Sequence, residues 1–109
     1  MKREFVRTDV FEKDWKDAGL NDGDLCELEN ILLLNPQAGN VIPGLSGGRK
    51  LRFAASGHGK SGGARVIYID VVVREHIYLL LAYPKNVQAD LTQEQKRALN
   101  KIITTIKEG

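Results

Sequence analysis

The sequence has a single cysteine, Cys26, and no long hydrophobic run. One cysteine cannot form an internal disulfide, which fits a reducing compartment. No apolar stretch approaches the roughly 20 residues that a membrane-spanning helix requires, and the first residues, MKREFVRTDVF, lack the apolar core of a secretion signal. We therefore expect a cytoplasmic protein with no membrane partner. Its 109 residues, 42% of them hydrophobic, predict one domain over residues 1–109.

Acidic residues are absent between Glu29 and Asp70, although the whole chain has a net charge of only +2. Residues 1–40 hold nine acidic and five basic side chains, whereas residues 41–91 hold three acidic and seven basic ones. The basic side chains inside the gap are Arg49, Lys50, Arg52, Lys60 and Arg65. Such a basic field in a nearly neutral protein indicates a polyanionic partner at one face, although an ordinary solvated surface can have the same composition.

The same stretch lacks the side chains that several classes of enzyme need. A two-metal nuclease uses clustered carboxylates, and none occur there. The two histidines, His58 and His76, do not have the spacing of a zinc site. Cys26 lies in an acidic, helix-forming region with no evident base, which disfavours a cysteine nucleophile. We expect no metal and no cofactor.

The segment AASGHGKS, residues 54–61, nearly matches the phosphate-binding pattern GxxxxGK[ST], with Ala54 in place of the first glycine. That pattern binds phosphate because the loop opens directly into the N-terminus of a helix. Here Ser61 is followed by GGARVIYID, which predicts a strand. The segment is therefore interpreted as a glycine-rich hairpin loop and not as a nucleotide site.

Periodicity and capping residues predict an α+β fold in the order β-α-α-β-β-β-α. The sheet is expected to be mainly antiparallel, with about four strands, an N-terminal helical hairpin and a C-terminal helix. Strands are expected at residues 2–8, 49–55, 64–70 and 77–83. The first helix is expected to be capped by Thr8 or Asp9 and ended by Gly19, and the second to be capped by Asn21 or Asp22 and stopped before Pro36. The last helix is expected to have Thr92 as its N-cap, with Gln95 in a capping box. Residues 36–48 are expected to form a loop rich in glycine and proline.

Strand alternation places Lys50 and Arg52 on one face of the sheet. Arg65 can lie beside them on the next antiparallel strand, and Lys85 can approach if the sheet curves. Arginine suits a phosphodiester because its planar fork binds two oxygens at once. A cationic cleft can cleave RNA without a metal when the ribose 2′-hydroxyl attacks its own 3′-phosphate. The residues alone indicate phosphate binding.

The segment RKLRFAASGHGKSGGARVIYI, followed by YLLLAYPKNVQADLTQEQ, resembles the RelE/HigB superfamily of bacterial type II toxins, in particular its HigB-like branch. The LLLNP that ends the second expected helix is also similar, so the resemblance covers nearly the whole chain. It implies a ribosome-dependent mRNA endonuclease that cuts the codon in the ribosomal A site and so inhibits translation. It also implies a bacterial cytoplasmic protein whose partners are mRNA, the ribosome and a cognate antitoxin, expected to be a helix-turn-helix protein from the same operon.

The resemblance also implies site residues. Lys50 and Arg52 match the paired basic positions of the family, and Arg65 matches its arginine in the following strand. Lys50 is then a base or an electrostatic stabiliser, and the two arginines clamp the phosphate and the transition state. RNA-binding or auxiliary roles fall to Arg49, His58, Lys60, Tyr83, Lys85 and Asn86. Asn86, beside Lys85, stands where the family member RelE has a further arginine. The general acid stays open among Tyr83, Lys85 and His58.

Two other functions compete with mRNA cleavage. ParE-like relatives share the fold and inhibit DNA gyrase without a nuclease site, and a nucleic-acid-binding module without catalysis is a third reading. The set of Lys50, Arg52 and Arg65 favours cleavage, because a gyrase inhibitor has no need of it.

A first prediction separates the glycine-rich loop from the strands that flank it. Lys60→Ala should reduce toxicity less than Arg65→Ala, because the loop lysine only extends the cationic surface whereas the strand arginine contacts the phosphate. Growth of cells expressing each variant measures the difference. Equal loss of toxicity in the two variants would contradict this assignment.

Overall fold

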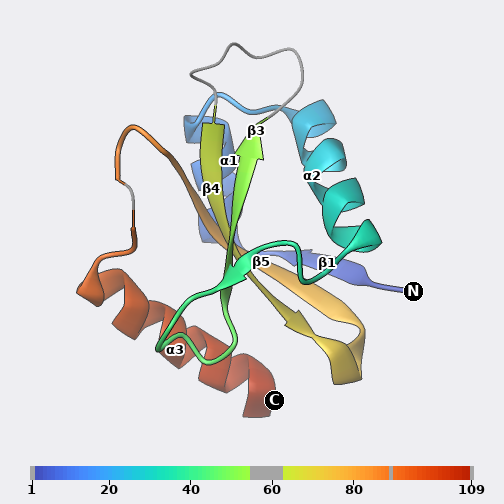
Figure 1. Ribbon diagram of the computed structural model, residues 1–109, viewed down its shortest axis with the longest axis vertical. Helices are drawn as coiled ribbons and strands as arrows, with labels where there is room; N and C mark the ends of the chain where they lie inside the picture. The colour runs from blue at the N-terminus through green and yellow to red at the C-terminus, as the bar shows by residue number, and fades with distance from the viewer. Residues whose placement is uncertain (1, 55–62, 89, 109) are drawn as a thin grey trace.

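The computed structural model describes residues 2–54, 63–88 and 90–108 (Figure 1). Most of the glycine-rich loop lies outside these ranges, so the expectations for His58 and Lys60 are not addressed by it. The described elements are β1 (Glu4–Arg7), α1 (Asp9–Asp17), α2 (Asp22–Leu34), β2 (Asn40–Val41), β3 (Arg49–Ala54), β4 (Gly63–Val71), the 3₁₀ turn η1 (Val72–Arg74), β5 (His76–Pro84) and α3 (Gln93–Glu108).

The strands form one sheet in the order β1-β5-β4-β3-β2. β1 runs parallel to β5, and every other pair is antiparallel. The expected α+β fold with a mainly antiparallel sheet is therefore confirmed, but the sheet has five strands and not about four. The extra strand, β2, lies in the stretch predicted as loop and pairs only Asn40 with Lys50 and Val41 with Arg49. Two residues are too few to show the alternation by which a strand is recognised in sequence.

The helices begin at the residues that the sequence marks as caps. Thr8 Oγ1 accepts a hydrogen bond from the Phe11 amide at 3.1 Å and starts α1. Asn21 forms a reciprocal capping box with the third residue of α2. Thr92 and Gln95 form the same motif before α3, at 3.0 and 3.1 Å. These bonds satisfy amides that a helix N-terminus leaves without partners.

None of the helices in the described ranges combines the length and hydropathy needed to cross a membrane.

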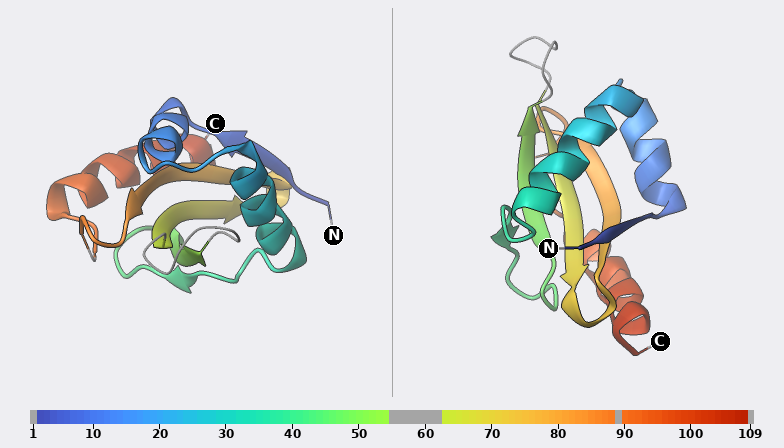
Figure 2. Two further views of the ribbon diagram at one scale, coloured as in Figure 1. Left: turned by 90° about the horizontal axis from the view of Figure 1, so that it is seen from above. Right: turned by 90° about the vertical axis from the view of Figure 1, so that its right-hand side faces the viewer.

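Helices cover the two faces of the sheet, with α1 and α2 against one face and α3 against the other (Figures 1 and 2). The first core joins residues of α1 and α2 to Leu51, Phe53, Val66, Tyr68 and Leu79. The second core joins Leu99 and Ile103 of α3 to Ile67, Ile69 and Leu81. Because side chains alternate along each strand, β4 and β5 supply both cores, whereas the buried residues of β3 belong to the first core alone.

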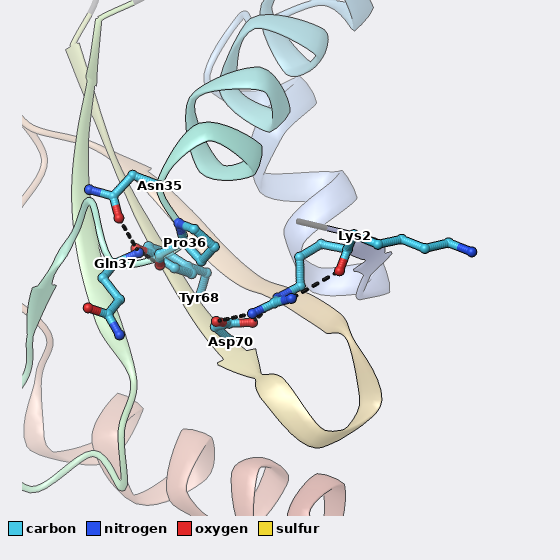
Figure 3. Close-up of polar contacts among 7 residues, drawn as sticks. Lys2, Asn35, Pro36, Gln37, Tyr68 and Asp70 are labelled. Atoms are coloured by element: carbon cyan, nitrogen blue, oxygen red, sulfur yellow. Dashed lines mark hydrogen bonds and ion pairs between the residues drawn. The ribbon is translucent and has the colours of Figure 1, made fainter.

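A buried tyrosine fixes the chain that leads from α2 into the sheet. The Tyr68 hydroxyl donates a hydrogen bond to the Pro36 carbonyl at 2.8 Å (Figure 3). It also accepts one from the Gly39 amide at 2.9 Å. Gly39 has no room for a side chain, since an added Cβ would lie 2.8 Å from the Lys50 carbonyl oxygen. These contacts hold residues 36–39 against β3, next to the predicted site.

We predict that Tyr68→Phe lowers the free energy of unfolding by about 1–3 kcal/mol, because it leaves a buried carbonyl and a buried amide without their partner. Urea denaturation of the purified protein measures the change. Tyr78→Phe is the matched control, because no hydrogen bond of the Tyr78 hydroxyl to another described residue is found. It should change stability by less than about 0.5 kcal/mol. Equal effects of the two substitutions would contradict the role given to Tyr68.

Candidate functional site

The register of the three central strands aligns two arginines and a tyrosine. Arg52 of β3 pairs with Arg65 of β4, and Arg65 pairs with Tyr83 of β5. Directly paired residues project from the same face of a sheet, with Cβ atoms about 4.5–5.5 Å apart. The three side chains therefore form a row across the sheet, on the face that α3 covers farther along the strands.

Lys50 extends this row along β3, because it lies two residues before Arg52 and so projects from the same face. It pairs with Ile67, which belongs to the core under α3. Lys50 and Arg52 both line a pocket of about 380 Å³ between β3, the chain around β2 and the start of α3. The other lining residues are Asn40, Val41, Ile42, Pro43, Asp90, Leu91 and Lys96.

A second, smaller pocket of about 210 Å³ joins Lys85 to the two arginines. It is lined by Arg52, Phe53, Ala54, Gly63, Arg65 and Lys85. The Lys85 amide donates to the Gly63 carbonyl at 3.2 Å, which holds the turn after β5 beside the start of β4. Arg52 lines both pockets, so the two form one continuous cationic surface. Asn86 is exposed in the turn that follows β5.

Arg49 lies on the opposite face of the sheet. It pairs with Tyr68, whose side chain packs in the core under α1 and α2. Its guanidinium donates to the Gly39 carbonyl at 2.7 Å, so the structure gives Arg49 a bond to the chain between α2 and β2. The structure thus brings together Lys50, Arg52, Arg65, Tyr83 and Lys85, and it separates Arg49 from them.

Tyr83 is buried in the row, with 5% of its surface exposed. Burial raises the pKa of the Tyr83 hydroxyl; the nearby Asp90 carboxylate raises it further, whereas Arg65 lowers it. The hydroxyl is therefore protonated at neutral pH, and it can donate a hydrogen bond or a proton but cannot act as a base.

The structure also places a carboxylate in the cationic surface, which the sequence analysis missed. Asp90 Oδ1 accepts a hydrogen bond from Lys50 Nζ at 2.8 Å. This contact lowers the pKa of the Asp90 carboxyl, and the charges of Lys96 and Arg65 lower it less. Asp90 is 40 residues from Lys50 in the chain, so local sequence gives no sign of the pair. One feature of the sequence does point to Asp90 lying near the sheet, because this residue is two positions before the N-cap of a helix expected to pack on the sheet.

No group of three or more His, Cys, Asp or Glu side chains that could hold a metal ion is found in the part of the chain that the structure describes. A larger groove of about 590 Å³ lies between α1, β5 and α3 and is lined mostly by apolar side chains. It shares Tyr83 with the row but contains none of the cations.

This fold matches that of a known toxin. The structure is similar to that of a double arginine-to-alanine mutant of the E. coli toxin RelE in the free state, with a TM-score of 0.62 and 17% sequence identity. The match covers 94% of this chain and 99% of the RelE chain. At this identity the similarity establishes the fold.

The family follows from the sequence. Residues 3–108 match the family model described as the RelE toxin of the RelE/RelB toxin–antitoxin system. The chain therefore belongs to the RelE toxin family, as the sequence analysis predicted, and a cognate antitoxin is its implied partner. Membership of the HigB-like branch stays a prediction.

The Asp90–Lys50 pair generates a titration prediction. The Asp90 carboxyl should titrate below the usual aspartate value of about 3.9, and Lys50→Ala should raise its midpoint toward that value. Because the folded-state pKa lies below the unfolded one, the pair favours the folded state above about pH 4 and this contribution is lost as the pH falls through the folded value. NMR titration of the side-chain carboxyl measures the midpoint.

Lys96→Ala serves as the comparison, because the charge of Lys96 acts on Asp90 more weakly than the contact with Lys50 does. It should raise the midpoint less than Lys50→Ala does. A midpoint that Lys50→Ala leaves unchanged would contradict the ion pair.

Proposed function

We propose that this chain is a ribosome-dependent mRNA endonuclease that cuts the codon in the ribosomal A site of a bacterial cell and thereby inhibits translation. Its activity would be neutralised by the antitoxin that the family implies, expected to be a helix-turn-helix protein from the same operon. The observation that carries the proposal is the alignment of Arg52 with Arg65, with Lys50 and Lys85 beside them, on one face of the sheet.

The proposed chemistry is an internal transesterification. The ribose 2′-oxygen forms a bond to the adjacent phosphorus, and the bond from phosphorus to the 5′-oxygen of the next nucleotide breaks. A 2′,3′-cyclic phosphate and a 5′-hydroxyl result. A base removes the 2′-hydroxyl proton, and an acid supplies one to the leaving oxygen. The reaction develops negative charge on the phosphorane, which positioned cations stabilise.

The site geometry supports distinct roles for the cations. Arg52 and Arg65 are directly paired, so their guanidinium groups can bind the two non-bridging oxygens of one phosphate. Lys50 adds charge in the pocket that it shares with Arg52, and its ammonium donates a hydrogen bond to the Asp90 carboxylate. That contact supports its role as an electrostatic stabiliser more than a role as base.

Two of the three candidates for the general acid, Lys85 and Tyr83, lie beside the paired arginines. Lys85 is exposed and lines the same pocket as both arginines. Tyr83 stays protonated because burial raises its pKa, and it lies in the same row. His58, outside the described residues, is the third candidate. The ParE-like alternative has no feature of the site in its favour.

We predict that Arg52→Ala and Arg65→Ala each slow mRNA cleavage roughly 100- to 1,000-fold and relieve growth arrest, because each removes a charge that binds the transition state. Lys50→Ala should also relieve the arrest. Mapping mRNA 5′ ends in translating reactions and in reactions without ribosomes measures the activity. Cuts within codons are expected only when ribosomes are present.

Arg74→Ala is the matched control. It removes the same charge in η1, at the far end of β4 from Arg65, and should leave cleavage unchanged. Full toxicity in all three site variants would overturn the assignment of the site. Inhibition of DNA gyrase with intact mRNA would overturn the function.

A further inference from the structure

The cationic surface contains its own counter-ion. Asp90 and Lys50 form an ion pair at 2.8 Å, in which the lysine side chain is 26% exposed and the aspartate side chain 80% exposed. The carboxylate therefore approaches the Lys50 ammonium from the solvent side, which is the side from which RNA must come. A carboxylate oxygen at this distance occupies the position that a phosphate oxygen would take.

Hydrogen bonds hold the chain around Asp90 in place. Gln88 Nε2 donates to the Asp90 carbonyl at 2.8 Å and to Gln95 Oε1 at 2.9 Å. Gln95 Oε1 also accepts from the Thr92 amide, which is half of the capping box of α3. The backbone of Asp90 is thus tied to the start of a helix, and the side chain can rotate away from Lys50 without moving that backbone.

The electrostatics of Asp90 favour a role as counter-ion of Lys50 over a role as general base. A base works best when its pKa lies near the operating pH. The contact with Lys50 lowers the pKa of the Asp90 carboxyl, which makes it a weaker proton acceptor than an ordinary aspartate. The carboxylate is also the group that repels an incoming phosphate most directly.

We propose that Asp90 is a specificity-determining residue that competes with RNA phosphate for Lys50 and weakens binding of RNA outside the ribosome. This inference rests on the proposed function, because it concerns the same RNA site. RNA that is held by many other contacts, as an A-site codon is, displaces the carboxylate. Free RNA, held only by the exposed cations, must compete with it.

The test uses a fluorescein-labelled, fully 2′-O-methylated RNA oligonucleotide, which cannot be cleaved because its 2′-hydroxyls are blocked. Fluorescence anisotropy gives its Kd with the full-length protein over a series of salt concentrations. Exposed ion pairs contribute little free energy, so Asp90→Asn should tighten binding only about two- to fivefold. One more available cation should also steepen the salt dependence of log Kd by about 0.7.

Two controls isolate the contact from the change in net charge. The first control, Glu94→Gln, removes the same charge from the first turn of α3, where Glu94 is exposed and has no ion pair with another described residue. This substitution should tighten RNA binding less than Asp90→Asn does. In a Lys50→Ala background, Asp90→Asn should tighten binding no more than Glu94→Gln does. A cycle of single and double variants isolates pairwise coupling in this way.

Several results would overturn the proposal: unchanged or weaker binding by Asp90→Asn, an equal gain from Glu94→Gln, or a gain that persists without Lys50. Slower cleavage by Asp90→Asn at unchanged RNA affinity would also overturn it, since Asp90 would then take part in the chemistry. Cleavage by the unaltered protein on programmed ribosomes is measured in parallel. Its absence would refute the proposed function, while the binding cycle would still decide the role of Asp90.

Discussion

The register between β3 and β4 is the constraint on which the rest of the structure depends. A shift of one residue would move every side chain to the other face of the sheet. In the observed register Phe53 faces Ala64 in one core, while Arg52 faces Arg65 on the other side. The pairing that buries the apolar residues therefore also brings the two arginines together, so folding and site assembly are a single event.

Two like charges directly opposite each other destabilise a sheet. The fold keeps Arg52 and Arg65 paired because the alternate residues of both strands are buried in the cores. Burial of one large apolar side chain is worth about 1.5–3 kcal/mol, which exceeds the roughly 0.2–1 kcal/mol of a cross-strand pair. An anion bound between the arginines would relieve their repulsion, which is a physical reason for the row to attract phosphate.

Local sequence predicts those parts of the fold that local physics decides. The caps Thr8 and Asn21 could be placed to within one residue and the cap Thr92 directly, because each depends on a side chain and an amide three residues away. The alternation that puts Lys50 and Arg52 on one face is equally local. The strand β2 is too short to show an alternation, and the parallel pairing of β1 with β5 joins segments far apart in the chain, so neither was specified by the sequence pattern.

The difference between local and distant contacts also explains which site residues could be predicted from the sequence and which could not. Arg65 could be placed beside Arg52 because a hairpin connects their strands, whereas Asp90 reaches Lys50 only through the packing of α3 on the sheet. That packing closes one side of the pocket and brings an acid into a region whose own sequence has none. The helix therefore sets both the shape and the charge of the cationic surface. A site described from its strands alone would be more positive than the one that the folded chain presents to RNA.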